Sequence, residues 1–212
     1  MITFFPTKKS TPEITTRTDS EFGIIQFIRS PRSRTIRIFV QPFQGIQIRM
    51  PHRLSVNEAL KFADKKRGWI REALVRAKLT EEKSRRHFSI TPQASRTEIR
   101  VVLQGRLEVL SHDHGFSFNK MSLRDQKSRW GSCSSQNNIS LNQKLYYLPD
   151  HLRDYVLIHE LAHTRVKNHG PHFWIILHNI FGRAETYKFR QELKDYDYLF
   201  HPPPADTSIP EN

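Results

Sequence analysis

The first third of the chain carries apolar residues at the spacing of short strands. Ile36, Ile38 and Val40 recur at every second position, which is the period of a strand with one buried face. Residues 23–28 and 46–50 form two further apolar stretches, and proline, serine and glycine occur in the segments between the three. The pattern predicts a three-stranded β-meander.

A helical period follows the predicted strands. Ser55 and Glu58 have the spacing of a capping box, in which each residue bonds the backbone of the other at the start of a helix. Apolar residues then recur on one helical face, which predicts a helix over residues 55–79. Residues 80–87 are mostly charged and predict a linker.

The remaining part of the chain predicts a second group of helices and strands. We expect a helix that opens at Thr91–Pro92, a strand over residues 116–124, and a hairpin over residues 129–142 with its turn at Gln136–Asn138. Three more helices follow, the first opening at Pro149–Asp150, the others covering residues 172–181 and 184–194. Helices and strands are largely segregated, which is typical of the α+β class.

The predicted elements divide the chain into four segments. They are a flexible tail over residues 1–19, a subdomain with the β-meander and its helix over 20–88, a second domain over 89–200, and a disordered, proline-rich tail over 201–212.

The helix expected after Pro149 contains the sequence HELAH, formed by residues 159–163. On a helix, positions i and i+4 share a face, so the imidazoles of His159 and His163 can bind one metal ion. Zinc favours such nitrogen ligands, and a catalytic zinc keeps one position open for water. Glu160 is next to His159, where its carboxylate can act as the general base toward that water.

The surrounding sequence favours a metal site over a chance match. The four residues Tyr155–Ile158 are apolar, and so are Leu161 and Ala162, which predicts a helix that is buried on nearly all sides. Two histidines and a glutamate in such a helix need partners, because unpaired buried polar groups are costly. A bound metal would satisfy all three.

The third metal ligand stays open on spacing alone. His169 follows at a distance known from the long zinc-protease motif, and its neighbours Asn168 and Gly170 tolerate the left-handed conformation of a turn. A helix that ends near Lys167 would present His169 to the metal. The alternatives are His172, His178 and Glu185.

Length and composition agree with a globular protein of one or two domains. The chain has 212 residues, and 37% of them are hydrophobic, which suffices for a core. No apolar run reaches the length of a membrane span, and the start lacks the features of a signal peptide. The single cysteine, Cys133, excludes an intrachain disulfide and is expected to pack as a small apolar residue. These features favour a cytoplasmic protein.

The charge bears on binding partners. Lys and Arg number 34 against 21 Asp and Glu, which gives a formal net charge of +13. Such an excess fits contact with nucleic acid, nucleotides or another polyanion, and it fits equally a basic, solvated surface. No segment resembles a membrane anchor, and the oligomeric state is open.

Several short motifs together resemble one family. They are Ser128–Ser134, Ile139–Asn142, Tyr155–Val156 before HELAH, and Asn168–Gly170 with Phe173–Trp174. As a set, over about residues 20 to 195, they resemble the YgjP-like metallopeptidases, which are similar to the SprT and Spartan proteases. The resemblance implies a zincin-like minimal metallopeptidase core, zinc bound by His159, His163 and His169, and Glu160 as general base.

The sequence therefore predicts a zinc-dependent hydrolase, foremost a metallopeptidase that acts on peptides or proteins. The edge of the 129–142 hairpin would bind the substrate backbone as an added strand. Arg129, Tyr155 and His172 are candidates for stabilising the oxyanion. The alternatives are a metal-dependent nucleotide phosphohydrolase and a basic nucleic-acid-binding protein with a structural zinc.

Overall fold

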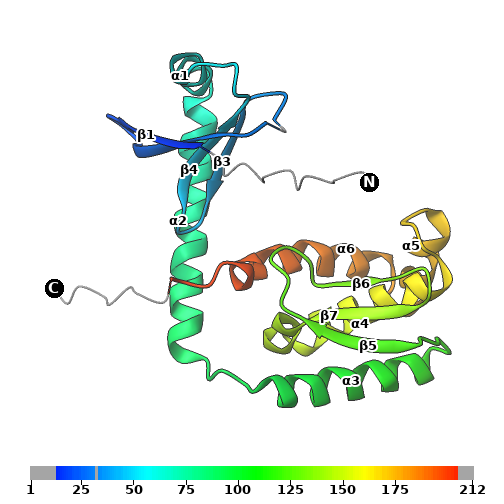
Figure 1. Cartoon of the computed structure of the whole chain (residues 1–212). Helices are drawn as coiled ribbons and strands as arrows, with labels where there is room; N and C mark the ends of the chain where they lie inside the picture. Colours follow the sequence, from blue (N-terminus) through cyan, green and yellow to red (C-terminus); the bar gives the residue numbers. More distant parts are fainter. Residues whose placement is uncertain (1–12, 32, 205–212) are drawn as a thin grey trace, which may run out of the picture. The chain divides into compact units, whose positions relative to one another are not determined.

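The computed structural model describes residues 13–31 and 33–204. The chain divides into two compact units, one formed by residues 1–82 with 204–212 and the other by residues 83–203. The division falls within the long helix α2, which covers Arg67–Ile90 (Figure 1). Each unit has its own hydrophobic core.

The first unit contains a four-stranded sheet. Its strands are β1 (Glu13–Asp19), β2 (Gly23–Arg29), β3 (Arg37–Gln41) and β4 (Gly45–Met50). Their order is β1-β2-β4-β3, with β2 and β4 parallel and the other two pairs antiparallel. The predicted three-stranded meander is therefore wrong, because β4 lies between β2 and β3. Alternation shows which face of a strand is buried, but not which strand is its neighbour.

The predicted flexible tail also needs correction. Residues 13–19 form strand β1, which pairs with β2 along its whole length. Its side chains are mostly exposed and polar, so no apolar alternation marks it, although threonine suits an edge strand. The other residues of that predicted tail, 1–12, lie outside the described part of the chain.

Two helices accompany this sheet. The predicted capping box opens α1 (Val56–Asp64): the backbone N–H of Ser55 donates to Glu58, and that of Glu58 donates to Ser55 Oγ. The expected single helix is interrupted after Asp64, and α2 begins at Arg67. Buried side chains of both helices pack against the inner face of β2 and β4.

The predicted linker at residues 80–87 is wrong, because α2 continues through it to Ile90. The charged residues of segment 80–87 favour a helix. One polar side chain of this segment also bonds to a residue far along the chain. Ser84 is fully buried and donates to the carbonyl oxygen of His201, at 2.6 Å. The same bond holds the start of the predicted C-terminal tail, whose residues 205–212 lie outside the described part.

The second unit combines a small sheet with helices, which confirms the α+β class. Its strands and longer helices are α3 (Arg96–Asp113), β5 (Lys120–Arg124), β6 (Gly131–Cys133), β7 (Asn138–Asn142), α4 (Asp150–Arg165), α5 (Pro171–Phe181) and α6 (Arg183–Glu192). Short 3-10 helices cover Gln143–Tyr147 and Leu193–Phe200. Among the described residues, no helix is long and apolar enough to cross a membrane.

The sheet of this unit has the order β5-β7-β6, so β6 is an edge strand. Strands β6 and β7 form the predicted antiparallel hairpin, and its turn places Asn137 at a positive φ of 58°. Strand β5 pairs with β7 in parallel. Helix α4 contacts α3, α5 and α6 as well as β6, which explains why nearly all of its sides are apolar.

Candidate metal centre

Helix α4 begins and ends close to where the sequence predicts. Pro149 is its N-cap residue and Asp150 lies in its first turn, where a carboxylate interacts favourably with the helix dipole. The helix ends at Arg165, and Val166 is extended. The chain therefore leaves the helix two residues before the expected Lys167 and turns back along it.

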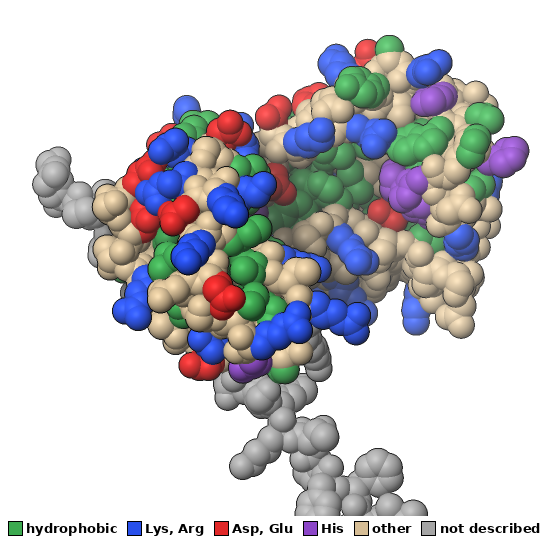
Figure 2. Space-filling model, turned by 90° about the horizontal axis from the view of Figure 1, so that it is seen from above, with side chains coloured by type: hydrophobic (Ala, Val, Ile, Leu, Met, Phe, Trp, Pro, Cys, Tyr) green, Lys and Arg blue, Asp and Glu red, His purple; other side chains and the backbone are tan. Residues whose placement is uncertain are grey.

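Three histidines converge at the end of this helix. His159 and His163 lie on one face of α4, and His169 lies in the turn that leads to α5. Nε2 of His169 is 3.0 Å from Nε2 of His159 and 3.1 Å from Nε2 of His163. The three form a group whose candidate ligand atoms all lie within 4.8 Å of one another. Figure 2 shows histidine side chains (purple) gathered at the surface beside an acidic one (red).

The hydrogen bonding of His163 determines its tautomer. Its Nδ1 lies 2.9 Å from the carbonyl oxygen of Val166. Because a carbonyl oxygen only accepts, Nδ1 must carry the proton. Nε2 is then left with a lone pair that faces the other two histidines, which is the state in which imidazole binds a metal.

The turn that carries His169 is held by side chains. Asn168 Oδ1 accepts from the backbone N–H of Gly170 at 3.0 Å, and Trp174 Nε1 donates to the carbonyl oxygen of His169 at 2.9 Å. The turn does not use the left-handed conformation that both residues tolerate, since neither Asn168 nor Gly170 has a positive φ. Glycine at 170 leaves room for this arrangement, because a Cβ there would lie 2.9 Å from Asn168 Oδ1 and the amide would have to shift.

One aromatic ring packs against all three imidazoles. Phe173, from α5, is fully buried. Its ring stacks on that of His163, with the ring centroids 4.5 Å apart. It makes T-shaped contacts with the rings of His159 and His169, at centroid distances of 4.8 Å and 4.7 Å. One apolar residue therefore fixes the orientation of three rings that come from two segments of the chain.

Burial keeps two of the histidines neutral. Desolvation, followed by the positive charges of His163 and His169 when protonated, lowers the pKa of His159 to about 3. Desolvation also lowers the pKa of His163. Both imidazoles are therefore neutral near pH 7, as metal binding requires.

Glu160 is the acidic group of the cluster. Its side chain is only 5% exposed, and burial raises its pKa to about 8. Its Oε2 is buried and has no hydrogen-bond partner. An isolated buried carboxyl oxygen is costly, and such groups occur mainly at functional sites.

Strand β6 passes close to the side chain of Glu160 at Gly131. A Cβ on Gly131 would lie 2.7 Å from Cγ, 2.8 Å from Oε1 and 2.9 Å from Cδ of Glu160. Only glycine leaves room for the carboxylate at this point. The contact was not foreseen from the sequence, although Gly131 stands in one of the motifs that carry the family resemblance.

A family model describes the domain that holds this cluster. The YgjP-like metallopeptidase domain matches residues 82–196, which is more than half of the chain. The chain belongs to the YgjP-like family. The match includes the three histidines, Glu160 and Gly131.

Two solved structures are similar to part of this metallopeptidase domain. One is the zymogen of abylysin from Pyrococcus abyssi, 21% identical, with a TM-score of 0.41 over 44% of this chain and 93% of that one. The other is the zymogen of jannalysin from Methanocaldococcus jannaschii, 22% identical, with a TM-score of 0.40 over 44% and 95%. A search of curated proteins found no match.

A cavity of about 290 Å³ opens beside His159 and Glu160 of the metallopeptidase domain. It is lined by Trp130, Gly131, Tyr155, Val156, His159, Glu160, Arg190 and Leu193. Tyr155, one of the oxyanion candidates, is nearly fully buried here, and desolvation raises its pKa to about 12. It therefore stays protonated and can donate.

Arg190 is a second cavity residue, after Gly131, that the sequence analysis did not identify. Its guanidinium lies over the ring of Trp174, 4.6 Å from the centroid, and forms no ion pair with any described residue. It comes from α6, 30 positions after Glu160, in a polar stretch without a motif. Only the packing of α6 against α4 brings it to the site, so no local signal marked it.

The other candidates lie apart from the cluster of three histidines. His172 is exposed, His178 is half-buried near Trp174, and Glu185 pairs with Lys188 at 3.6 Å. Arg129 is exposed and does not line the cavity. Of the four candidates for a third ligand, the structure brings only His169 to the two histidines of α4.

Cys133 is half-buried in β6, and burial raises the pKa of its thiol, which agrees with an unreactive side chain. Lys167 lies near it, with Nζ 3.6 Å from the sulfur and 2.8 Å from the carbonyl oxygen of Ser134. Lys167 also donates to the side chain of Asn137. The segment before His169 is thereby tied to the β6–β7 hairpin.

Proposed function

We propose that this protein is a zinc-dependent peptidase in which His159, His163 and His169 bind the metal and Glu160 is the general base. One observation carries the proposal: three Nε2 atoms converge beside a buried carboxyl oxygen that has no partner. The family supports peptide-bond hydrolysis as the reaction.

The residues fit a zinc ion in number, type and spacing. Tetrahedral nitrogen ligands at zinc distances lie about 3.3 Å from one another. The separations of 3.0 and 3.1 Å between the imidazole nitrogens are close to this value. A structural zinc would use four protein ligands, whereas the cluster within residues 13–31 and 33–204 offers three.

The chemistry divides between the ion and the chain. A bound zinc would polarise the scissile carbonyl and lower the pKa of a water molecule. Glu160 takes a proton from that water on its free Oε2 and passes it to the leaving amine.

The substrate would bind along the edge of β6. Among the described residues, β7 is the sole strand neighbour of β6, so the other edge of β6 can pair with an extended peptide. Because Gly131 touches Glu160, a peptide on this edge would run close to the carboxylate. Tyr155 and Arg190 line the same cavity and would stabilise the negative charge that develops on the carbonyl oxygen.

The test separates metal binding from chemistry. Glu160→Gln should retain zinc, measured by mass spectrometry of the purified protein, and lose hydrolysis of a peptide library. His159→Ala combined with His163→Ala should lose both. Full zinc in the double variant would contradict the metal assignment, and an unimpaired Glu160→Gln would contradict the role of the base.

Nucleotide substrates belong in the same assay, because the net charge of +13 agrees with a nucleotide phosphohydrolase or a nucleic-acid-binding protein as well. Figure 2 shows basic side chains (blue) spread over the visible face and interspersed with acidic ones (red), rather than gathered in one patch. Hydrolysis of nucleotides and not of peptides would favour the phosphohydrolase.

A further inference from the structure

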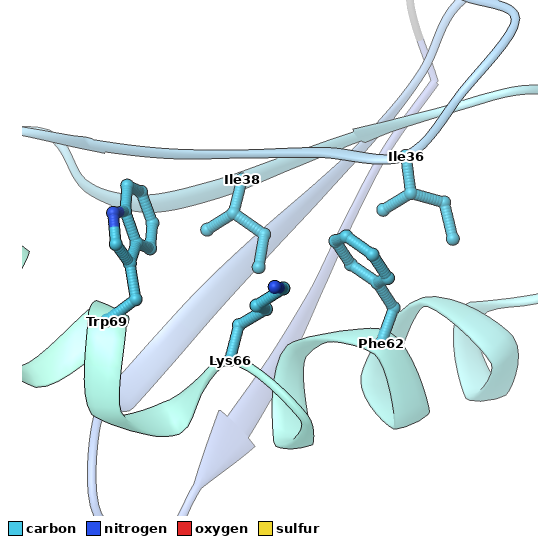
Figure 3. A pocket seen from close by; sticks show the side chains of 5 residues that line it. All are labelled: Ile36, Ile38, Phe62, Lys66 and Trp69. Atoms are coloured by element: carbon cyan, nitrogen blue, oxygen red, sulfur yellow. The ribbon is translucent and has the colours of Figure 1, made fainter.

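The first unit contains a second, apolar hollow that has no part in the metal centre. It measures about 260 Å³ and is lined by Ile36, Ile38, Phe62, Lys66 and Trp69. Figure 3 shows the two isoleucines pointing from the strand segment toward the helices, and the other three side chains pointing toward the strand. The hollow is therefore open between one strand and the helical layer that faces it.

That strand is β3, which forms the edge of the sheet. In the order β1-β2-β4-β3, the described residues give β3 only one neighbour, β4. Its other edge presents backbone N–H and C=O groups without strand partners. Such an edge is a template for one more extended chain.

The helical layer carries apolar side chains at the place that a fifth strand would cover. Trp69 remains 46% exposed, and its indole N–H makes no hydrogen bond within the described part of the chain. Phe62 is half-buried and lines the other end of the same hollow (Figure 3). Because side chains alternate along a strand, every second residue of an added strand would face Phe62 and Trp69.

The charge of the hollow is positive. Lys66 places its ammonium among the apolar side chains, and it forms no ion pair with a described residue. Neighbouring acidic groups are already paired: Asp64 with Arg67 at 3.1 Å, and Glu72 with Arg76 at 3.6 Å. An incoming peptide would therefore supply the carboxylate that Lys66 lacks.

We propose that the edge of β3 and the adjoining hollow bind an extended acidic segment of another protein. The segment adds a strand next to β3, inserts a bulky apolar side chain between Phe62 and Trp69, and pairs an acidic side chain with Lys66. The edge supplies affinity through the backbone, and the hollow and Lys66 supply specificity. The site is independent of the proposed peptidase activity.

A second copy of the chain is a poorer occupant. Pairing through two β3 edges would bring a second Lys66 and a second Arg37 to the same region, and like charges at close range repel. An acidic partner removes this repulsion instead of adding to it.

The experiment selects peptides from a random seven-residue library displayed on phage, using the immobilised full chain. Wild type should enrich sequences in which apolar residues alternate with other positions and an acidic residue recurs. Dissociation constants of the selected peptides are then measured by fluorescence polarisation. Lys66→Glu should weaken binding about tenfold or more, since it turns an attraction into a repulsion. Lys65→Glu is the matched control, because this exposed neighbour does not line the hollow.

Three further outcomes decide the proposal. Trp69→Ala should abolish enrichment while circular dichroism shows an intact fold. N-methylation of alternate peptide amides should weaken binding, because the added strand would lose its hydrogen bonds to β3. Equal effects of Lys65→Glu and Lys66→Glu, or no enrichment relative to Trp69→Ala, would overturn the proposal. So would a dimer in analytical ultracentrifugation that Trp69→Ala dissociates, since the occupant would then be a second copy.

Discussion

Replacing Gly131 by alanine should impair catalysis without removing the metal. The new Cβ would lie 2.7 Å from Cγ of Glu160, whereas ordinary carbon contacts begin at about 3.5 Å. Backbone on both sides is fixed, Gly131 by its pairing with Leu141 and Glu160 by helix α4. The carboxylate must therefore move by the better part of an ångström.

The size of the effect follows from that displacement. A misplacement of about 1 Å in a reacting group can cost about 10²-fold in rate, or about 2.7 kcal/mol. We expect kcat/KM of Gly131→Ala to fall by about this factor on the peptide that wild type cleaves. Zinc content should stay at the wild-type level, because the three atoms nearest to the new methyl group all belong to Glu160 and none to a histidine.

The control variant is Gly105→Ala. This glycine lies within α3, and a Cβ there meets nothing within 4 Å. The variant should keep full activity and gain about 0.5–1 kcal/mol of stability, since alanine is the better helix former. Wild-type kcat/KM in Gly131→Ala would refute the reasoning, as would a loss of zinc parallel to the loss of activity.

Three further predictions concern the ligands, the aromatic support and the first unit. In competition titrations, His169→Ala should weaken zinc affinity by more than the roughly 10–100-fold that is typical when a residue outside the ligand shell is changed. Glu185→Ala should leave zinc affinity unchanged in the same titrations. A larger loss of affinity in Glu185→Ala than in His169→Ala would favour the glutamate as ligand. Phe173→Ala should lower the free energy of unfolding by about 3–5 kcal/mol in urea titrations, because a fully buried ring is lost; a cost below 1 kcal/mol would contradict its packing role. The pKa of Asp19 is held well below its usual range by hydrogen bonds from Arg67. Its stabilising effect is therefore fully present above the unfolded pKa of about 3.9 and is lost progressively as pH falls from there through the lower pKa of the folded state. Asp19→Asn should therefore destabilise the protein more at pH 7 than at pH 2 in thermal unfolding, and an equal difference at both pH values would contradict the linkage.

The parts of the site that the sequence predicts are those within one turn of helix or one tight turn. The i, i+4 spacing puts His159 and His163 on one face whatever surrounds them, and Pro149 marks the start of the helix. The residues Gln136–Asn138 likewise predict the turn of the hairpin, since asparagine readily adopts the positive φ that the structure has at Asn137. Local geometry alone determines these features.

The parts that could not be predicted depend on contacts between distant segments. Strand β4 lies between β2 and β3, with Ile46 and Ile48 buried, and the alternation of apolar residues does not specify this strand order. Residues 80–87 stay helical partly through the bond of Ser84 to residue 201. Arg190 reaches the cavity only through the packing of α6.

The β6–β7 hairpin shows why the HELAH motif alone does not determine the geometry of this site. The histidine pair and Glu160 are set by α4, but the position of the carboxylate is limited by Gly131 on β6. The same hairpin accepts hydrogen bonds from Lys167, two residues before His169. One element therefore contacts both the proposed base and the segment that carries the third histidine. Loosening the hairpin should disturb proton transfer and metal binding together, whereas Gly131→Ala should disturb proton transfer alone.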